Sequence, residues 1–165
     1  EDAIWRANLD GTRSLIAAAE AAAPAARLVM ASTGRVYDSG QLRPGREGDP
    51  CAPSAAYPAS KFAAEELLRG SVLNYSILRL PFVYGDGDGH LAMIPTMAPR
   101  FGMHPARTFS ACHHRDVMTA IEIALSGAMD GRIVNNADDR PVLCRRRDAS
   151  RWRDDIVCGG CDRLP

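Results

Sequence analysis

A tyrosine and a lysine, Tyr57 and Lys61, stand four residues apart at the start of a predicted helix. Residues i and i+4 lie on one face of a helix, so the phenol and the ammonium would point the same way. A free phenol has a pKa of about 10 and is a poor base at neutral pH, but a nearby cation favours the phenolate. The pair could therefore act as a general acid and base. Alternatively, both residues are common on helix surfaces and have no chemical role here.

Two hydroxyl residues, Ser32 and Thr33, follow the short apolar run at residues 28–31. This run is typical of a buried parallel strand, and open α/β sheets bind ligands at the carboxyl ends of such strands. The Thr33 hydroxyl could therefore hydrogen-bond a substrate oxygen and polarise it. The alternative is that both side chains only satisfy backbone groups in a turn.

Helices and strands alternate along the chain, which is typical of an α/β fold with a parallel sheet. The predicted helices span residues 8–23, 57–69 and 115–125, and the predicted strands span residues 28–31, 75–80, 108–112 and 132–135. We expect Asp116 to cap the last helix at its N-terminus. Loops are expected at 38–53 and 85–89, and residues 91–100 show no clear periodicity.

A series of ordered motifs resembles the extended short-chain dehydrogenases, the NAD-dependent epimerase/dehydratase family. The motifs are Asn8-Leu-Asp-Gly-Thr12, Ser32-Thr33 followed by Val36-Tyr37, Tyr57-Pro-Ala-Ser-Lys61 and Arg79-Leu-Pro-Phe-Val-Tyr-Gly85. Residues 113–135 also resemble the segment that leads into the family's C-terminal substrate lobe. The resemblance covers roughly residues 4–141. It implies a Rossmann-like, doubly wound parallel sheet.

The resemblance also implies roles for particular residues. Thr33 matches the residue that hydrogen-bonds the reacting oxygen, and Tyr57 matches the general acid/base of a hydride transfer at a carbonyl or alcohol carbon. Lys61 matches the residue that holds the nicotinamide ribose hydroxyls. The expected cofactor is NAD or NADP, and the expected partner is a small-molecule substrate. Besides Tyr57 and Lys61, the expected cofactor-binding residues are Pro81, Phe82 and Val83.

Other residues of the matching segments are expected to be structural. Arg79 is interpreted as an ion-pair partner and Gly85 as a turn residue, and Asn8 and Asp116 also receive structural roles. The pair His113 and His114 could contact substrate, although surface or packing roles are commoner at a strand end.

The sequence departs from the family in its glycine pattern and at Phe82. It contains neither G-x-x-G-x-x-G nor G-x-G-x-x-G, the loop that brings backbone amides to the cofactor pyrophosphate. We therefore expect a truncated member that lacks the first strands, and the choice between NAD and NADP stays open. Nucleotide-sugar epimerases of the family often have Asn where this chain has Phe82. A less polar carbonyl or alcohol substrate is therefore as plausible as a nucleotide sugar.

The tail, residues 142–165, changes in character and is rich in Arg, Gly and Cys. We expect a partial nucleotide-binding domain with the start of a substrate lobe at residues 1–141, followed by a poorly ordered, atypical tail in place of a full lobe. A shifted reading frame would explain this change. Cys158 and Cys161 have the C-x-x-C spacing of a redox pair or half a zinc site, but no second half is evident. We therefore expect no metal site.

Composition narrows the classes of protein further. Lys and Arg together number 20, and Asp and Glu together also number 20. This balance of charge argues against nucleic-acid binding. No apolar run approaches the roughly 18 residues of a membrane span, and the start does not resemble a signal peptide. A cytoplasmic location is expected. Family members are often dimers through the helix that carries the tyrosine, and the sequence neither supports nor excludes a homodimer.

The sequence thus predicts an NAD(P)-dependent oxidoreductase of the epimerase/dehydratase family. The alternative is a non-catalytic remnant that no longer binds cofactor and needs a partner to cover exposed apolar surface. Cofactor binding separates the two hypotheses, whereas retention of Thr33, Tyr57 and Lys61 does not.

Overall fold

The computed structural model describes residues 2–38, 40, 43–100, 102, 104 and 108–143. The chain divides into two compact units. Residues up to Pro81, together with Arg115–Asn136, form the first unit. Phe82–His114 and the described residues from Ala137 form the second.

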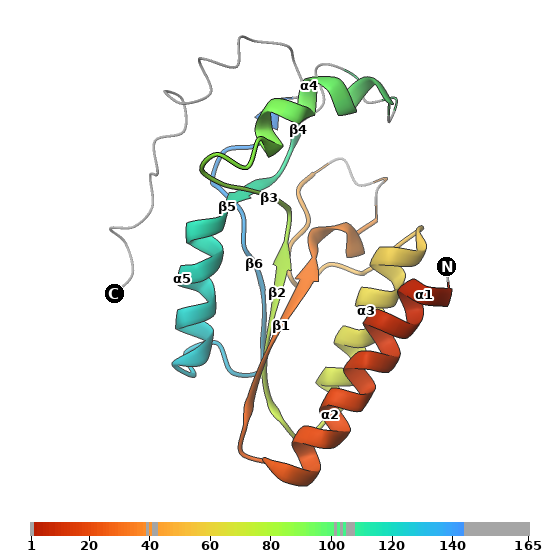
Figure 1. Cartoon of the computed structure of the whole chain (residues 1–165), viewed down its shortest axis with the longest axis vertical. Coiled ribbons are helices and arrows are strands. Elements are labelled where there is room, and N and C mark those ends of the chain that lie inside the picture. Colours follow the sequence, from red (N-terminus) through yellow and green to blue (C-terminus); the bar gives the residue numbers. More distant parts are fainter. Residues whose placement is uncertain are drawn as a thin grey trace. The chain divides into compact units, whose positions relative to one another are not determined.

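The first unit is built on a parallel sheet of three strands, β1 (Arg27–Thr33), β2 (Asn74–Leu80) and β6 (Arg132–Asn135), in the order β1-β2-β6. Helices lie on both faces of this sheet, with α2 and α3 on one side and α5 on the other (Figure 1). Thr33 pairs with Leu80, so β1 and β2 end side by side at their carboxyl ends. The predicted α/β class with a parallel sheet is confirmed.

The helical segments of the first unit are α1 (Asp2–Trp5), a π-helical segment η1 (Arg6–Asp10), α2 (Gly11–Ala22), α3 (Ala56–Arg69) and α5 (His114–Leu125), which belongs to this unit from Arg115 on. Buried residues lie on α2, α3 and α5, whereas α1 and η1 have none. Ile16 of α2 and Leu68 of α3 meet Leu73 and Ile77 in one buried cluster. Removing such side chains from water is the main favourable contribution to folding, so this cluster fixes α2 and α3 against β2.

The second unit consists of short elements. Strand β3 (Phe82–Tyr84) pairs in parallel with β5 (Ala111–His113), and β4 (Thr108–Phe109) pairs antiparallel with β7 (Val142–Leu143). Helix α4 (His90–Arg100) completes the unit. Its core is a smaller cluster of Tyr84, Ile94, Ala111 and Val142.

One helix was not predicted, and two predictions about local structure were wrong. Residues 91–100 lie in α4, whose Pro95 and Pro99 obscure a helical pattern because proline disfavours helix interiors. The single strand predicted at 108–112 is two strands separated at Ser110, whose carbonyl accepts a hydrogen bond from the Phe82 amide at 3.3 Å. Asp116 does not cap α5, because the helix begins at His114 and Asp116 lies in its first turn.

The poorly ordered tail was predicted to begin at residue 142, but Val142 and Leu143 form strand β7. Residues 144–165, which include Cys144, Cys158 and Cys161, lie outside the described residues. Among the helices that the structure describes, each is too short or too polar to cross a membrane.

Candidate active site

Helix α3 carries Tyr57 and Lys61 in its first turns. Ala55 precedes the helix in an extended conformation, and Pro58 lies near the helix start, where proline is tolerated because the first amides have no partner inside the helix. Tyr57 is 41% exposed, whereas Pro58 and Ser60 are buried. The helix therefore turns its buried side into the unit and leaves the Tyr57 ring accessible.

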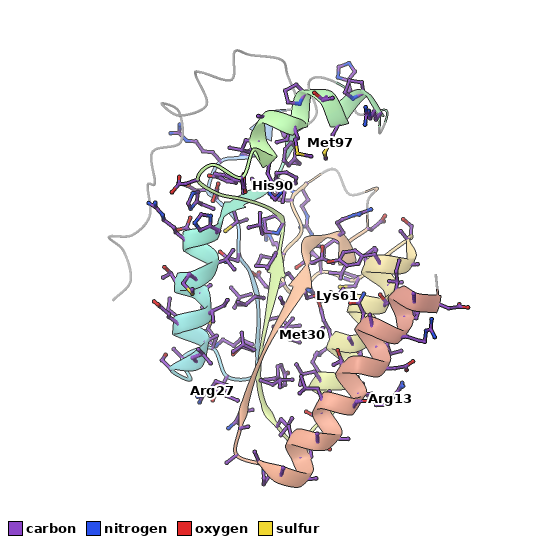
Figure 2. The ribbon with its side chains drawn as sticks, in the orientation of Figure 1. Arg13, Arg27, Met30, Lys61, His90 and Met97 are labelled. Carbon is purple, nitrogen blue, oxygen red and sulfur yellow. The ribbon has the colours of Figure 1, made fainter. Side chains whose placement is uncertain are left out.

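The Lys61 ammonium is anchored to strand β1. Its Nζ donates a hydrogen bond to the Ala31 carbonyl oxygen at 3.0 Å. Figure 2 shows Lys61 between α3 and the upper part of β1, with Arg27 at the opposite end of the strand. An ammonium has three N–H donors, and the bond to Ala31 uses one of them. The contact fixes Lys61 two residues before Thr33 along β1.

Thr33 ends β1 and is buried, with 6% of its surface exposed. Its Oγ1 accepts a hydrogen bond from the Arg35 amide at 3.3 Å and so caps the short 3₁₀ turn η2 (Gly34–Val36). Thr33 therefore does satisfy a backbone group in a turn, as the alternative interpretation of the sequence expected. Accepting this bond uses an oxygen lone pair, so the hydroxyl hydrogen is still a donor.

Asn8 connects the N-terminal helix to the Tyr57 turn. Its Nδ2 donates to Ser60 Oγ at 2.9 Å, and Ser60 Oγ donates to the Tyr57 carbonyl oxygen at 2.9 Å. Asn8 lies in the π-helical segment η1. These bonds give Asn8 the structural role that the sequence suggested.

A buried ion pair lies one turn of α3 beyond Lys61. Arg79 Nη2 donates to Glu65 Oε2 at 2.6 Å, and the two side chains are only 2% and 0% exposed. Ser32 donates to Glu65 Oε1 from the end of β1. Arg79 Nη1 donates to the Tyr37 hydroxyl at 2.9 Å, and that hydroxyl donates to Asn135 Oδ1 at 2.8 Å. We call Ser32, Tyr37, Glu65, Arg79 and Asn135 the buried network. Ser32, Glu65 and Arg79 are buried, and Tyr37 and Asn135 at its edge are half-buried.

The buried network keeps Arg79 charged. Burial opposes the charge and lowers the pKa of Arg79, but the hydrogen bonds to Glu65 and Tyr37 outweigh it and hold the pKa above its ordinary value. The network joins α3 to the carboxyl ends of β1, β2 and β6. It therefore fixes the helix that carries Tyr57 against the strand that carries Thr33.

Sequence reasoning identified Arg79 as an ion-pair partner, and the structure confirms this interpretation. It did not identify Glu65 as the partner. The available signal was helical spacing: Glu65 lies two turns after Tyr57 and one after Lys61, on the side of α3 that faces the strand ends. Leu68 is buried on this side of α3, whereas Phe62, Ala63 and Leu67 are half-buried.

The remaining predicted cofactor residues fall on both sides of the boundary between the units. Pro81 is half-buried and ends the first unit directly after β2. Phe82 and Val83 belong to β3 of the second unit, where Phe82 makes edge-to-face ring contacts with Phe109 and His90. The structure thus places Thr33, Tyr57, Lys61 and Pro81 in one unit and Phe82 and Val83 in the other.

The NAD dependent epimerase/dehydratase family is the family whose model matches this chain, over residues 1–135. The chain belongs to this family. Over 82 residues it is 34% identical to the spore coat polysaccharide biosynthesis protein SpsK of Bacillus subtilis (strain 168), an alignment that covers 50% of the chain and 29% of SpsK.

Solved structures show that this family member has a Rossmann-like fold. The dTDP-glucose 4,6-dehydratase of Bacillus anthracis, solved with NAD, superimposes with a TM-score of 0.70 at 23% identity, over 84% of this chain and 49% of the dehydratase. RMD of Pseudomonas aeruginosa, solved with NADPH, superimposes with a TM-score of 0.69 at 22% identity, over 85% of this chain and 54% of RMD. The chain thus spans about half the length of these structures.

Proposed function

We propose that this family member carries out NAD(P)-dependent hydride transfer at an alcohol or carbonyl carbon of a small-molecule substrate. The observation that carries the proposal is the placement of Tyr57 and Lys61 on α3, with the Lys61 ammonium bound to β1 two residues before Thr33. The exposed Tyr57 ring is accessible to a substrate.

In the proposed reaction, the Tyr57 phenolate accepts the proton of the substrate hydroxyl and the Thr33 hydroxyl donates a hydrogen bond to the same oxygen. A nicotinamide cofactor, when bound, would supply the hydride acceptor and donor that interconvert the alcohol and the carbonyl compound. In the reverse direction, Tyr57 returns the proton to the carbonyl oxygen. Proton transfer by a positioned side chain accelerates such steps by about 10²–10⁴-fold.

The residues present fit the nicotinamide end of the cofactor. The Lys61 ammonium has N–H donors beyond the one that binds Ala31, and ribose hydroxyls are suitable acceptors. Pro81 stands at the carboxyl end of β2, where open α/β sheets bind nucleotides. The sequence has no glycine-rich phosphate loop, so the proposal assigns no residue to the pyrophosphate. Either NAD or NADP is compatible with this end of the site.

The proposed substrate is either a nucleotide sugar or a less polar alcohol or carbonyl compound. The dehydratase that acts on dTDP-glucose and the polysaccharide biosynthesis protein SpsK favour the first class. Phe82 favours the second class, because a phenyl ring cannot hydrogen-bond a sugar hydroxyl.

The first experiment is isothermal titration of the folded chain with NAD and with NADP. Saturable binding near one site per chain supports the proposal. If a chain that circular dichroism shows to be folded binds neither cofactor, the chain is a non-catalytic remnant and the proposal fails.

The second experiment tests Tyr57 once turnover has been found with a panel of nucleotide sugars and small alcohols. Tyr57→Phe removes only the hydroxyl and is expected to lower kcat by about 10²–10⁴-fold, with cofactor affinity changed far less. Tyr75→Phe, on strand β2, is the matched control and should keep the wild-type rate. Wild-type turnover in Tyr57→Phe would remove Tyr57 from the mechanism.

A further inference from the structure

Three side chains of the second unit, none of them assigned to the proposed active site, gather at one point. Asp86, His113 and His114 each offer one ligand atom, and these atoms lie within 4.8 Å of one another. All three residues belong to the same compact unit. Two imidazoles and a carboxylate are common ligands of transition-metal ions in proteins.

The backbone explains why two adjacent histidines face the same way. Successive residues of a strand point to opposite faces of the sheet. Strand β5 ends at His113 and helix α5 begins at His114, so the chain changes conformation between the two residues. The two imidazole rings consequently lie side by side, with centroids 4.4 Å apart and planes inclined by 34°.

Strand pairing brings Asp86 to the histidines. Tyr84, the last residue of β3, pairs with His113 in the parallel register, and their rings also meet edge to face. Asp86 follows Tyr84 by two residues, in a turn whose Gly87 and Gly89 have positive φ. The turn therefore places the carboxylate beside His113 although the two residues are far apart in sequence.

The spacing of the ligand atoms suits a metal ion better than a direct hydrogen bond. His113 Nε2 and Asp86 Oδ1 are 3.6 Å apart, which is too long for a hydrogen bond. Metal–ligand distances of 2.0–2.2 Å in a tetrahedral zinc site separate the ligand atoms by about 3.4 Å. Asp86 and His114 are exposed, so small side-chain rotations can close the remaining distances.

Gly85 leaves the room that His114 occupies. A Cβ at position 85 would lie 1.8 Å from His114 Nδ1 and 2.5 Å from its Cε1. Gly85 is not among the glycines with positive φ, so its backbone conformation does not require glycine. The reason for a glycine at this position is space for the imidazole, which refines the turn role expected from the sequence.

We propose that Asp86, His113 and His114 bind a divalent transition-metal ion, with Zn²⁺ the best match to two imidazoles and one carboxylate. Harder ions such as Mg²⁺ and Ca²⁺ prefer sites made of oxygen ligands alone. The three residues leave a fourth tetrahedral position for water or another ligand. The bound ion links the turn after β3, which carries Asp86, to the junction of β5 and α5, which carries the two histidines. The sequence predicted no metal site because it does not show that Asp86 and the histidines meet.

The test is a Zn²⁺ titration of the full chain carrying Cys144→Ser, Cys158→Ser and Cys161→Ser, so that the thiols of the tail do not compete. We expect saturable binding of one ion per chain without any cofactor or substrate. His114→Ala and Asp86→Asn are each expected to weaken binding by at least about tenfold, the lower limit seen when groups around metal sites are removed. Gly85→Ala should weaken it as well, because its Cβ displaces the His114 ring.

His90→Ala and Asp88→Asn are the matched controls. His90 and Asp88 form another exposed His–Asp pair of the same unit, with a separation of 3.0 Å, and the two variants should bind Zn²⁺ within twofold of the parent. Circular dichroism confirms that each variant is folded. Absence of saturable Zn²⁺ binding in the folded parent overturns the proposal. The proposal also fails if His114→Ala and Asp86→Asn both bind Zn²⁺ with the affinity of the parent. Neither result depends on nucleotide binding, so the test is separate from that of the proposed function.

Discussion

In the first unit, the side chains proposed for chemistry rest on long elements and a buried ionic network. In the second, the candidate metal ligands lie on a glycine-containing turn and at the end of a three-residue strand. Strands β1 and β2 pair over seven residues, whereas β3 and β5 pair over three. Each paired residue adds backbone hydrogen bonds and buried surface, so the first unit is expected to hold its side chains more rigidly.

The difference suggests a division of roles within one chain. Positioning a catalytic tyrosine to a fraction of an ångström requires support from a second layer of fixed side chains. In the proposed function, the pair of Glu65 and Arg79 provides that support for Tyr57 by fixing α3 to the end of β2. A short unit with a small core gains more from a bound ion, because ligand binding to the folded form alone adds directly to stability.

The largest expected effect comes from breaking the buried network in the first unit. Glu65→Ala leaves the Arg79 guanidinium buried without its carboxylate, which should reduce the free energy of unfolding by about 3–5 kcal/mol. Urea denaturation followed by circular dichroism measures the change. Glu66→Ala is the matched control, because its pair with Arg69 is exposed and should contribute no more than about 1 kcal/mol. Equal losses in the two variants would contradict the importance given to the network.

A smaller effect is expected from the corresponding polar contact of the second unit. The Tyr84 hydroxyl donates to Asp138 Oδ2 at 3.0 Å, and Tyr84→Phe removes this bond while keeping the buried ring. Hydrogen bonds to charged groups contribute about 1.5–3 kcal/mol. Hydrogen exchange measured by mass spectrometry should show faster exchange in β3 and β5 peptides and little change in β1 and β2. Faster exchange throughout the chain would mean that the two units do not open separately.

The smallest effect concerns a half-buried carboxylate of the first unit, Asp49, whose partner Arg43 is exposed. Arg43 binds both oxygens of Asp49 at 2.7 Å, and with the Arg46 amide it lowers the pKa of Asp49 to about 2. Because the folded pKa is depressed, the resulting stabilisation is fully present above the unfolded pKa of about 3.9 and is lost as pH falls through about 2. In an NMR titration of the side-chain carboxyl, Arg43→Met should move the Asp49 pKa upward. An unchanged pKa in that variant would rule out Arg43 as the main cause.

Much of the first unit could be predicted from the sequence. The unbroken apolar run before Ser32 and the Ala-rich pattern before Pro24 identify β1 and α2. The strand at 28–31 is less buried than predicted, because residues 28–30 are half-buried and Ala31 is exposed. The strand at Arg132–Asn135 was predicted with its observed bounds. The motif around Tyr57 and Lys61 indicated the candidate site because the i, i+4 spacing of a helix is fixed by geometry.

The second unit could be predicted less well, for physical reasons. Helix α4 contains two prolines, and strands of two or three residues are too short to show alternation. The approach of Asp86 to His113 depends on the pairing of β3 with β5, which is a long-range contact. Local sequence patterns contain no information about such pairing. Helical spacing places Glu65 on the side of α3 that faces the strand ends, but it does not identify Arg79 as its partner.

The parallel register of β1 and β2 makes this part of the chain sensitive to changes in length. Thr33 lies opposite Leu80, and Ser32 lies opposite Arg79. The Ser32 hydroxyl, which binds Glu65, and the Thr33 hydroxyl, which is proposed to bind substrate, therefore occupy successive positions of β1. Inserting or deleting one residue within β1 would move every following side chain to the other face of the sheet. Related sequences should therefore vary in residue type at the exposed Ala31 while keeping the number of residues between Arg27 and Thr33 constant.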